Sequence, residues 1–275
     1  MSFTTADVVK LRKVTGAGMM DCKNALKDSE GDFDKALQII REKGKAIANK
    51  RADRDAAEGV VLAKITADNK FGAVVVLNCE TDFVAKNDKF VAFVDSILNV
   101  ALANKTESLD ALKALELDGT LIDTLVTEQT GVIGEKLELS YYKSISAESV
   151  IGYIHPGNKL ATLVGFNKGD VEIQVAKDIA MQIAAMAPVA IDKDAISQEV
   201  IDKEIEIAKE KYRQEGKPEA MLDKIAQGSL NKWFKDVTLL NQTYVKDGKI
   251  SIKEFLKKTD SELTVTAFDR FTLDA

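Results

Sequence analysis

Two matching stretches of sequence, "NKFGAVVVLN" (69–78) and "NKLATLVGFN" (158–167), decide the fold of this chain. They share their first two residues, their last residue and their apolar pattern. Each follows a β-rich run, 58–68 in the first copy and 148–157 in the second, and each leads through the letters "VAK" into a helical segment. Turn-forming residues, Asp-Asn in one copy and Pro-Gly-Asn in the other, separate the runs. The pair therefore predicts two β-hairpins, each followed by a helix, in a pseudo-repeated, two-half α+β core with antiparallel sheets.

Helical patterns flank this core on the N-terminal side. Residues 1–48 have the pattern of three short helices, in which Thr4 or Thr5 opens the first and Asp32 caps the third. An apolar core of this size is marginal on its own, so we expect the unit to pack on the rest of the chain or to be tethered to it. The charged stretch 49–59 predicts a linker or a solvated extension of the third helix.

Residues 195–236 predict an antiparallel helical hairpin with a coiled-coil-like seam. The break between its helices lies at Gly216-Lys217-Pro218. The expected stripes are Ile201, Ile205, Ala208 and Tyr212 on the first helix and Met221, Leu222, Ile225 and Trp233 on the second. The whole chain then divides into a three-helix module (1–50), a first core half (51–140), a second core half (141–194 and 237–275) and the inserted hairpin (195–236).

Composition excludes several classes of function. The 275 residues carry a net charge of −6 with acidic and basic residues interspersed, and no basic stripe supports direct nucleic-acid binding. The longest uncharged stretch, 179–191, is shorter than the roughly 20 residues of a membrane-spanning helix. The N-terminus lacks a secretion or transit signal. With only two cysteines, Cys22 and Cys79, the chain is expected to be cytoplasmic, without a metal site or a disulfide framework.

The stretch "NCETDFVAKN" (78–87) looks most like a reactive site. A nucleophilic Cys79 would need a base, and the only histidine, His155, lies in the second hairpin turn. Glu80 and Asp82 could form an acid–base pair, although carboxylates beside a helix start usually serve as caps or exposed charges. No phosphate-binding glycine motif occurs. The sequence therefore predicts neither a catalytic group nor a cofactor, with an enzyme built on these residues as an alternative.

Comparison of the two copies moves attention to Phe83. Where the second copy has the simple turn "KGDVEIQ" (168–174), the first has "CETDF" (79–83). Phe83 precedes Phe90, the start of the next apolar stripe, by seven residues, which would allow burial in phase, whereas Asn87 between them opposes it. Core packing and outward presentation both stay open. An exposed aromatic side chain beside a carboxylate would be an anchor for a protein partner.

Two segments, "LRKVTGAGMMDCKNAL" (11–26) and "LNCETDFVAKN" (77–87), resemble the signature segments of the bacterial translation elongation factor Ts family. The resemblance continues through essentially the whole chain, in "GVIGEKLELSYY" (131–142), "GYIHPGNKLATLVGF" (152–166), "EGKPE" (215–219) and "VTAFDRF" (265–271). Members of this family are guanine-nucleotide exchange factors for the GTPase elongation factor Tu. The resemblance implies a non-enzymatic function in translation elongation, in which the nucleotide site belongs to the partner.

The resemblance also implies roles for residues of the N-terminal half. The three-helix unit is similar to the ubiquitin-associated-like module of the family, with Arg12, Met19 and Met20 at the positions that contact the GTPase. Packing inside the small unit is the alternative for the two methionines. The tip that enters the GTPase matches four consecutive residues, Thr81, Asp82, Phe83 and Val84. There Phe83 would insert between helices and Asp82 would pair nearby, which disturbs the Mg²⁺ site.

Three further matches lie later in the chain. Ile133 and Gly134 match the segment that approaches the phosphate-binding loop of the GTPase, and His155 matches a histidine that also reaches the partner. The helical hairpin is similar to a module associated with self-association, which implies a possible homodimer or 2:2 complex. Two positions depart from the family: Lys159 stands where an arginine is expected, and the chain ends four residues after Phe271, so contacts through a C-terminal extension are not carried over.

Two functions remain to be distinguished. The first is exchange by linkage, in which the factor and the bound GDP with its Mg²⁺ each weaken the binding of the other. The second is a non-catalytic adaptor or chaperone-like binding module that docks on a GTPase without releasing its nucleotide. The rate of GDP release separates them.

Overall fold

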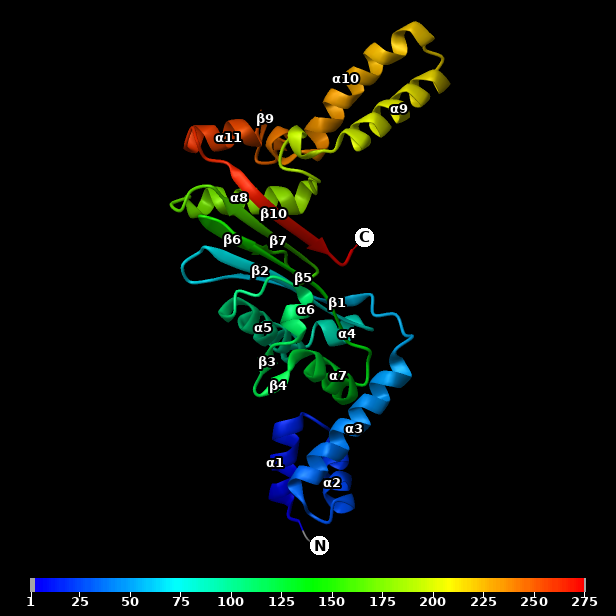
Figure 1. Ribbon diagram of the computed structural model, residues 1–275, viewed down its shortest axis with the longest axis vertical. Coiled ribbons are helices and arrows are strands. Elements are labelled where there is room, and N and C mark those ends of the chain that lie inside the picture. Colours follow the sequence, from blue (N-terminus) through cyan, green and yellow to red (C-terminus); the bar gives the residue numbers. More distant parts are fainter. Residues whose placement is uncertain (1–2, 275) are drawn as a thin grey trace.

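The protein is elongated, with three helices at its N-terminal end and a helical hairpin at the opposite end (Figure 1). This computed structural model describes residues 3–274. Two three-stranded antiparallel sheets lie between the ends, and helices cover the outer side of each sheet. Within the described residues, no helix combines the length and the apolar character needed to cross a membrane. The chain is thus a mixed α+β protein.

The N-terminal unit consists of three helices: α1 (Thr5–Thr15), α2 (Met19–Asp28) and α3 (Phe33–Arg51). Thr4 caps α1, because its hydroxyl accepts from the N–H of Asp7 while the Asp7 carboxylate accepts from the N–H of Thr4. Asp32 caps α3 as predicted. Because α3 continues to Arg51, the start of the charged stretch extends the helix, and residues 52–57 connect it to the first sheet.

Both predicted hairpins are confirmed, and each acquires a third strand from later in the chain. The first sheet contains β1 (Glu58–Ile65), β2 (Phe71–Cys79) and β5 (Glu138–Ser146), and the second contains β6 (Ser149–Ile154), β7 (Leu160–Phe166) and β10 (Val265–Thr272). The strand orders are β1-β2-β5 and β10-β7-β6, so the second strand of each hairpin is central. β2 is buried along nearly its whole length, because helices cover one of its faces and the second sheet covers the other.

The two hairpins hold each other through reciprocal hydrogen bonds between the sheets. The N–H of Val61 in β1 donates to the carbonyl of Asn158 at 2.7 Å, and the N–H of Val150 in β6 donates to the carbonyl of Asn69 at 2.6 Å. Asn69 and Asn158 occupy equivalent positions of the two hairpin turns, and both have a positive φ, 55° and 56°. The same contact is therefore made twice, once in each direction.

The helices that follow the hairpins form the outer layers. They are α4 (Asp82–Ala85) and α5 (Asp88–Ala103) after the first hairpin, and α8 (Ile173–Met186) after the second. Three apolar cores result: one between α5 and the first sheet, one between the two sheets, and one between the second sheet and α8. The order of layers is visible in Figure 1, where α8, the two sheets and α5 follow one another down the picture.

Shorter elements complete the chain. The stretch 105–135 contains α6 (Leu109–Lys113) and α7 (Ile122–Ile133), and between them a small antiparallel pair, β3 (Glu116–Leu117) and β4 (Thr120–Leu121). The second half adds two 3-10 turns (Lys193–Ala195 and Leu239–Asn241), β8 (Thr243–Tyr244), β9 (Asp247–Ser251) and α11 (Ile252–Thr259).

The helical hairpin consists of α9 (Gln198–Gln214) and α10 (Glu219–Val237). The predicted position of Met221 in its seam is wrong, because this side chain is half exposed. The buried stripe of α10 instead passes through Leu222, Ala226, Leu230 and Phe234, at a constant spacing of four residues. Met221 precedes this stripe by one residue, which rotates it by about 100° around the helix axis. Ile225 and Trp233, which were predicted on the same stripe, also precede buried residues by one position and are half-buried.

Candidate functional site

The turn that follows β2 presents an aromatic side chain to solvent. Thr81 caps the single turn of α4, since its hydroxyl accepts from the N–H of Val84 at 3.4 Å. Ala85 is the buried residue of this turn, and Val84 packs against the first core. Phe83 points away from both and is 83% exposed. Phe83 is the most exposed large apolar side chain in the described part of the chain, and it is aromatic, the residue type that anchors protein interfaces.

Outward presentation of Phe83 is therefore confirmed, and its burial in phase with Phe90 is wrong. The reason lies in the break between α4 and α5. Asn87 caps α5, with its side chain accepting from the N–H of Lys89 at 2.9 Å, so the helix starts afresh at Asp88. The seven-residue spacing consequently does not run along one continuous helix, and the two phenylalanines lie on unrelated faces.

Two carboxylates, those of Glu135 and Glu80, hold the turn between β2 and α4 in place through hydrogen bonds. The carboxylate of Glu135 accepts from the N–H of Glu80 at 3.1 Å, from the N–H of Thr81 at 3.0 Å and from the Thr81 hydroxyl at 2.7 Å. The carboxylate of Glu80 accepts from the N–H of Lys136 at 2.5 Å and from the Arg51 guanidinium at 2.7 and 2.9 Å. Sequence reasoning missed Glu135 and Arg51. The only local signal for Glu135 was its position directly after a glycine that ends a helix, and Arg51 had no such signal.

Ile133 and Gly134 lie beside this turn at the end of α7. Gly134 ends the helix in the left-handed conformation, with φ 79°, and its N–H donates to the carbonyl of Thr130. Ile133 is half-buried and packs against the first core. It lines, together with Val84, a hollow of about 410 Å³ that also reaches Gly16 of the N-terminal unit.

The predicted contact residues of the N-terminal unit lie outside its core. That core consists of Val8, Leu11, Ala17, Cys22, Ala25, Leu26 and Ala36. Met19 is 40% and Met20 is 62% exposed, so packing inside the unit, the alternative for these methionines, is wrong. Arg12 is also exposed, and it lines with Met19 a hollow of about 440 Å³.

His155 lies at the exposed turn between β6 and β7. Its Nδ1 is 2.9 Å from the hydroxyl of Tyr153, and the two rings are tilted with centroids 6.1 Å apart. Three residues of the same turn, Gly157, Asn158 and Lys159, face Asp82 across a hollow of about 260 Å³. The second hairpin thus flanks the turn that carries Phe83.

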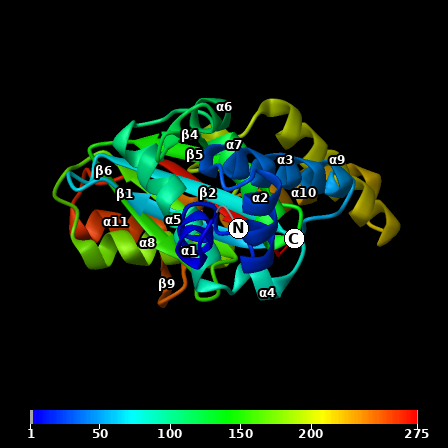
Figure 2. The same ribbon diagram turned by 90° about the horizontal axis from the view of Figure 1, so that it is seen from below.

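Two of these hollows adjoin each other and connect predicted residues of the N-terminal unit with Val84 and Ile133. Gly16 and Lys89 line both the hollow that holds Arg12 and Met19 and the hollow that holds Val84 and Ile133. Seen from the N-terminal end, α4 lies at the edge of the molecule (Figure 2). Residues from three distant segments (Arg12 with Met19, Val84, and Ile133) therefore line adjoining hollows, which together with the neighbouring exposed Phe83 form a composite face.

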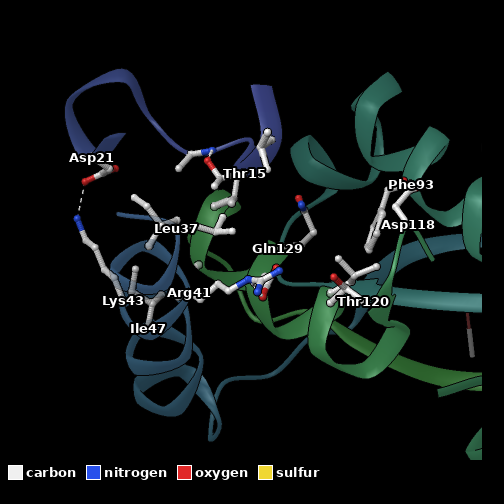
Figure 3. Close-up of a pocket in the computed structure, with 18 of the residues that line it drawn as sticks. Thr15, Asp21, Leu37, Arg41, Lys43, Ile47, Phe93, Asp118, Thr120 and Gln129 are labelled. Atoms are coloured by element: carbon white, nitrogen blue, oxygen red, sulfur yellow. Dashed lines mark hydrogen bonds and ion pairs between the residues drawn. The ribbon is translucent and has the colours of Figure 1, made fainter. Parts of the chain in front are cut away.

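A further cleft of about 460 Å³ lies between the N-terminal unit and the core (Figure 3). It shares Phe93, Gln129 and Val132 with the hollow lined by Val84 and Ile133. Leu37, Arg41 and Ile47 of α3 line one side, and Gln129 of α7 lies opposite. Arg41 Nε is 2.8 Å from a carboxylate oxygen of Glu128. This cleft contains none of the predicted contact residues, and it marks the place where α3 crosses α7.

The crossing of α3 and α7 is tight because two glycines meet there. Gly44 is a buried residue of α3, and Gly131 lies in the last turn of α7. A Cβ atom on Gly131 would overlap the Cα of Gly44, whereas a Cβ on Gly44 would meet the backbone of Glu128 at an ordinary 3.6 Å. The missing side chain of Gly131 is thus what lets the N-terminal unit dock on the core.

The reactive groups of the turn are occupied by structural partners. Cys79 is buried, its Sγ donates to the carbonyl of Thr81 at 3.2 Å, and burial raises the pKa of the thiol to about 12. Asp82 pairs with Lys86 at 2.6 Å, which lowers the pKa of its carboxyl, while Glu80 pairs with Arg51. In residues 3–274, no cluster of His, Cys, Asp and Glu side chains is placed to hold a metal ion. A nucleophilic Cys79 and an acid–base pair of Glu80 and Asp82 are therefore both unsupported.

We expect the thiols of the native protein to react more than about 100-fold more slowly than those of the unfolded chain with a disulfide reagent at pH 8. Both cysteines are buried, which keeps the reagent from reaching them. In addition, the Cys79 thiol, with a pKa near 12, is ionised to a fraction on the order of 10⁻⁴ at this pH. Stopped-flow absorbance of the chromophore that the thiol displaces from the reagent measures the rate for the native protein without denaturant and the rate for the unfolded chain with it. Rapid labelling of Cys79 in the native protein would contradict this prediction and support a nucleophilic role for Cys79.

Comparison with known proteins assigns the chain to a family. A family model described as elongation factor TS matches residues 80–275. Relatives named elongation factor Ts include those of Porphyromonas gingivalis, 53% identical over all of both chains, and Azobacteroides pseudotrichonymphae, 50% identical over all of this chain and 99% of the relative. That of Bacteroides fragilis is 43% identical over all of both chains. The chain, with its exposed phenylalanine on a composite face, belongs to the elongation factor Ts family.

Proposed function

We propose that this protein is a guanine-nucleotide exchange factor in translation elongation. It binds elongation factor Tu in the GDP form, disturbs the Mg²⁺ and phosphate site of that GTPase and promotes GDP release, so that GTP can bind. The observation that carries the proposal is the 83% exposure of Phe83, on a turn held from behind, in a member of the elongation factor Ts family. The protein contributes no catalytic group and acts by binding.

The mechanism is a linkage between two ligands of the same GTPase. GDP with its Mg²⁺ stabilises one conformation of elongation factor Tu, and this protein binds another conformation better. By linkage, each ligand then weakens the binding of the other by the same factor, about tenfold for every 1.4 kcal/mol of coupling. Insertion of Phe83 supplies binding free energy that is available only when the nucleotide site is deformed.

The residues of the composite face take separate roles in this proposal. Phe83 inserts between helices of the GTPase, and Thr81, Asp82 and Val84 form the rest of the entering tip. Asp82 would exchange its bond to Lys86 for a partner group, a small change because that ion pair is largely exposed.

The remaining residues extend the contact on both sides of the tip. Arg12 with the adaptable pair Met19 and Met20 docks the N-terminal unit on the GTPase. Ile133 and Gly134 approach the phosphate-binding loop, and His155 contacts the partner from the second half.

The finer organisation of the chain fits the same proposal. We interpret the three helices as a ubiquitin-associated-like module and the core as a duplicated unit, which the reciprocal bonds of Val61 and Val150 support. The division into 1–50, 51–140, 141–194 with 237–275, and 195–236 stays a prediction. So do the cytoplasmic location and the homodimer or 2:2 complex.

The release rate of GDP tests the proposal directly. Elongation factor Tu loaded with a fluorescent GDP analogue is mixed with excess unlabelled GDP, with or without this protein. We expect the factor to accelerate release and to weaken the affinity of the GTPase for GDP by about 5- to 150-fold, the range of a typical coupling free energy. Co-elution of the two proteins without acceleration would instead support the adaptor or chaperone-like function, and unchanged release without binding would contradict both.

A further inference from the structure

We propose that Glu80 and Glu135 form a reciprocal carboxylate clamp that positions Phe83 for nucleotide exchange. Neither side chain has a contact role in the proposed complex, and both act through the turn between β2 and α4. The inference rests on the proposed function, because it explains how the tip is held ready before the GTPase arrives. Glu80 and Glu135 are thus positioning residues, and Arg51 is an accessory member of the clamp.

The clamp continues the pairing of two strands beyond the point where their backbone ladder ends. Pairing of β2 with β5 ends at Asn78 and Glu138. Beyond this pair, the side chain of Glu135 accepts the amide hydrogens of Glu80 and Thr81, while the side chain of Glu80 accepts the amide hydrogen of Lys136. Each segment therefore satisfies the backbone donors of the other through a carboxylate, a charge-assisted hydrogen bond that is stronger than a neutral one.

The charge and burial of Glu80 require that its carboxylate keep these partners. The side chain of Glu80 is 17% exposed, so an unpartnered carboxylate there would be costly. The N–H of Lys136 is the main group that holds the pKa of the Glu80 carboxyl below its usual range, and Arg51, the last residue of α3, adds to it and supplies the compensating charge. Through Arg51 the clamp also reaches the N-terminal unit.

Positioning is needed because Phe83 has no packing of its own. Its direction depends on the start of α4, and that start is defined by Thr81, which Glu135 holds through both its amide and its hydroxyl. Glu135 in turn follows Gly134 directly, so the Phe83 tip and the Ile133–Gly134 segment cannot move independently. A tip that is already ordered avoids the entropy of ordering upon binding, which raises affinity without any new contact.

A double-mutant cycle tests this role. We expect Glu135→Ala to slow GDP release at a limiting concentration of the factor by about tenfold, the effect of losing charge-assisted hydrogen bonds. In a Phe83→Ala background the same change should slow release by less than about twofold, because residues that act as a unit are not additive. Glu107→Ala, which removes an exposed carboxylate outside the clamp, is the matched control and should leave release unchanged. Equal losses from Glu135→Ala in both backgrounds would overturn the proposal.

Hydrogen exchange of the free protein separates the clamp from the function. The amides of Glu80 and Thr81 should exchange faster in Glu135→Ala than in the wild type, and the amide of Lys136 faster in Glu80→Ala. Unchanged exchange at these amides disproves the clamp whatever the GTPase assay shows. A wild-type protein that does not accelerate GDP release disproves the function while the amide result stands. If Glu135→Ala does not fold, Glu135→Gln keeps the side-chain shape and should give the same pattern with smaller changes.

Discussion

Replacement of Phe83 by alanine is expected to raise the concentration of the factor needed for half-maximal stimulation of GDP release by about 30- to 1000-fold. This range corresponds to the roughly 2–4 kcal/mol carried by an aromatic anchor at the centre of an interface. The protein itself should stay intact, because Phe83 lies outside every apolar core and is 83% exposed. We expect the free energy of unfolding to change by less than about 0.5 kcal/mol, as for other surface substitutions. Fluorescent GDP release and urea unfolding measure the two quantities.

Ile173→Ala is the matched control for this prediction. Ile173 is a comparably exposed apolar side chain, 68%, at the start of α8 in the second half. Its truncation should change neither GDP release nor stability. If Phe83→Ala released GDP as fast as the wild type, insertion of Phe83 would be wrong, although exchange by another contact could stand. A loss shared equally by both variants would show that general surface hydrophobicity, not the tip, matters.

Replacement of Gly131 by alanine is expected to loosen the docking of the N-terminal unit at a cost of about 1–3 kcal/mol, typical of an overpacked contact. The new methyl group would overlap the Cα of Gly44, and neither helix backbone can yield without separating α3 from α7. Separation would also disturb the Arg41–Glu128 ion pair in the cleft. Faster amide exchange in α3 and α7 measures the loosening, and a lower urea midpoint measures its effect on stability.

Gly44→Ala provides a stringent control, since it adds the same methyl group to the other side of the same contact. Its Cβ would lie 3.6 Å from the Glu128 carbonyl, an ordinary separation, so docking should persist. Higher helix propensity should even stabilise α3, by up to about 1 kcal/mol. Equal destabilisation by the two substitutions would contradict the asymmetric packing of the crossing.

Much of the fold could be predicted because its signals are local. A hairpin needs two neighbouring apolar runs and a turn, and the turn residues Asn69 and Asn158 do adopt the left-handed conformation that favours asparagine. Helix starts at Thr4 and Asp32 were likewise predictable from capping chemistry. The pairing of β5 with β2 was not, because it depends on which distant strand fills a sheet edge.

The candidate site was predicted only in part, for the same physical reason. The difference between the two copies of the repeat singled out Phe83, but periodicity alone left its burial open until the cap at Asn87 was known. The role of Glu135 did not follow from the local sequence pattern, since its hydrogen-bond partner Thr81 lies 54 residues away. Met221 was misplaced because it is next to Leu222 in the sequence, and a shift of one residue points a helical side chain in a very different direction.

The pairing of β10 with β7 has a consequence for synthesis of the chain. Val265 lies opposite Phe166, so the central strand of the second sheet waits for a neighbour that is made 99 residues later. At about 5–20 residues per second, the ribosome needs about 5–20 seconds to deliver it. Throughout that interval β7 has one unpaired edge, a template for pairing with other chains. The second half is therefore the part of the nascent protein whose correct folding depends most on the pace of translation, the process that the finished molecule is proposed to serve.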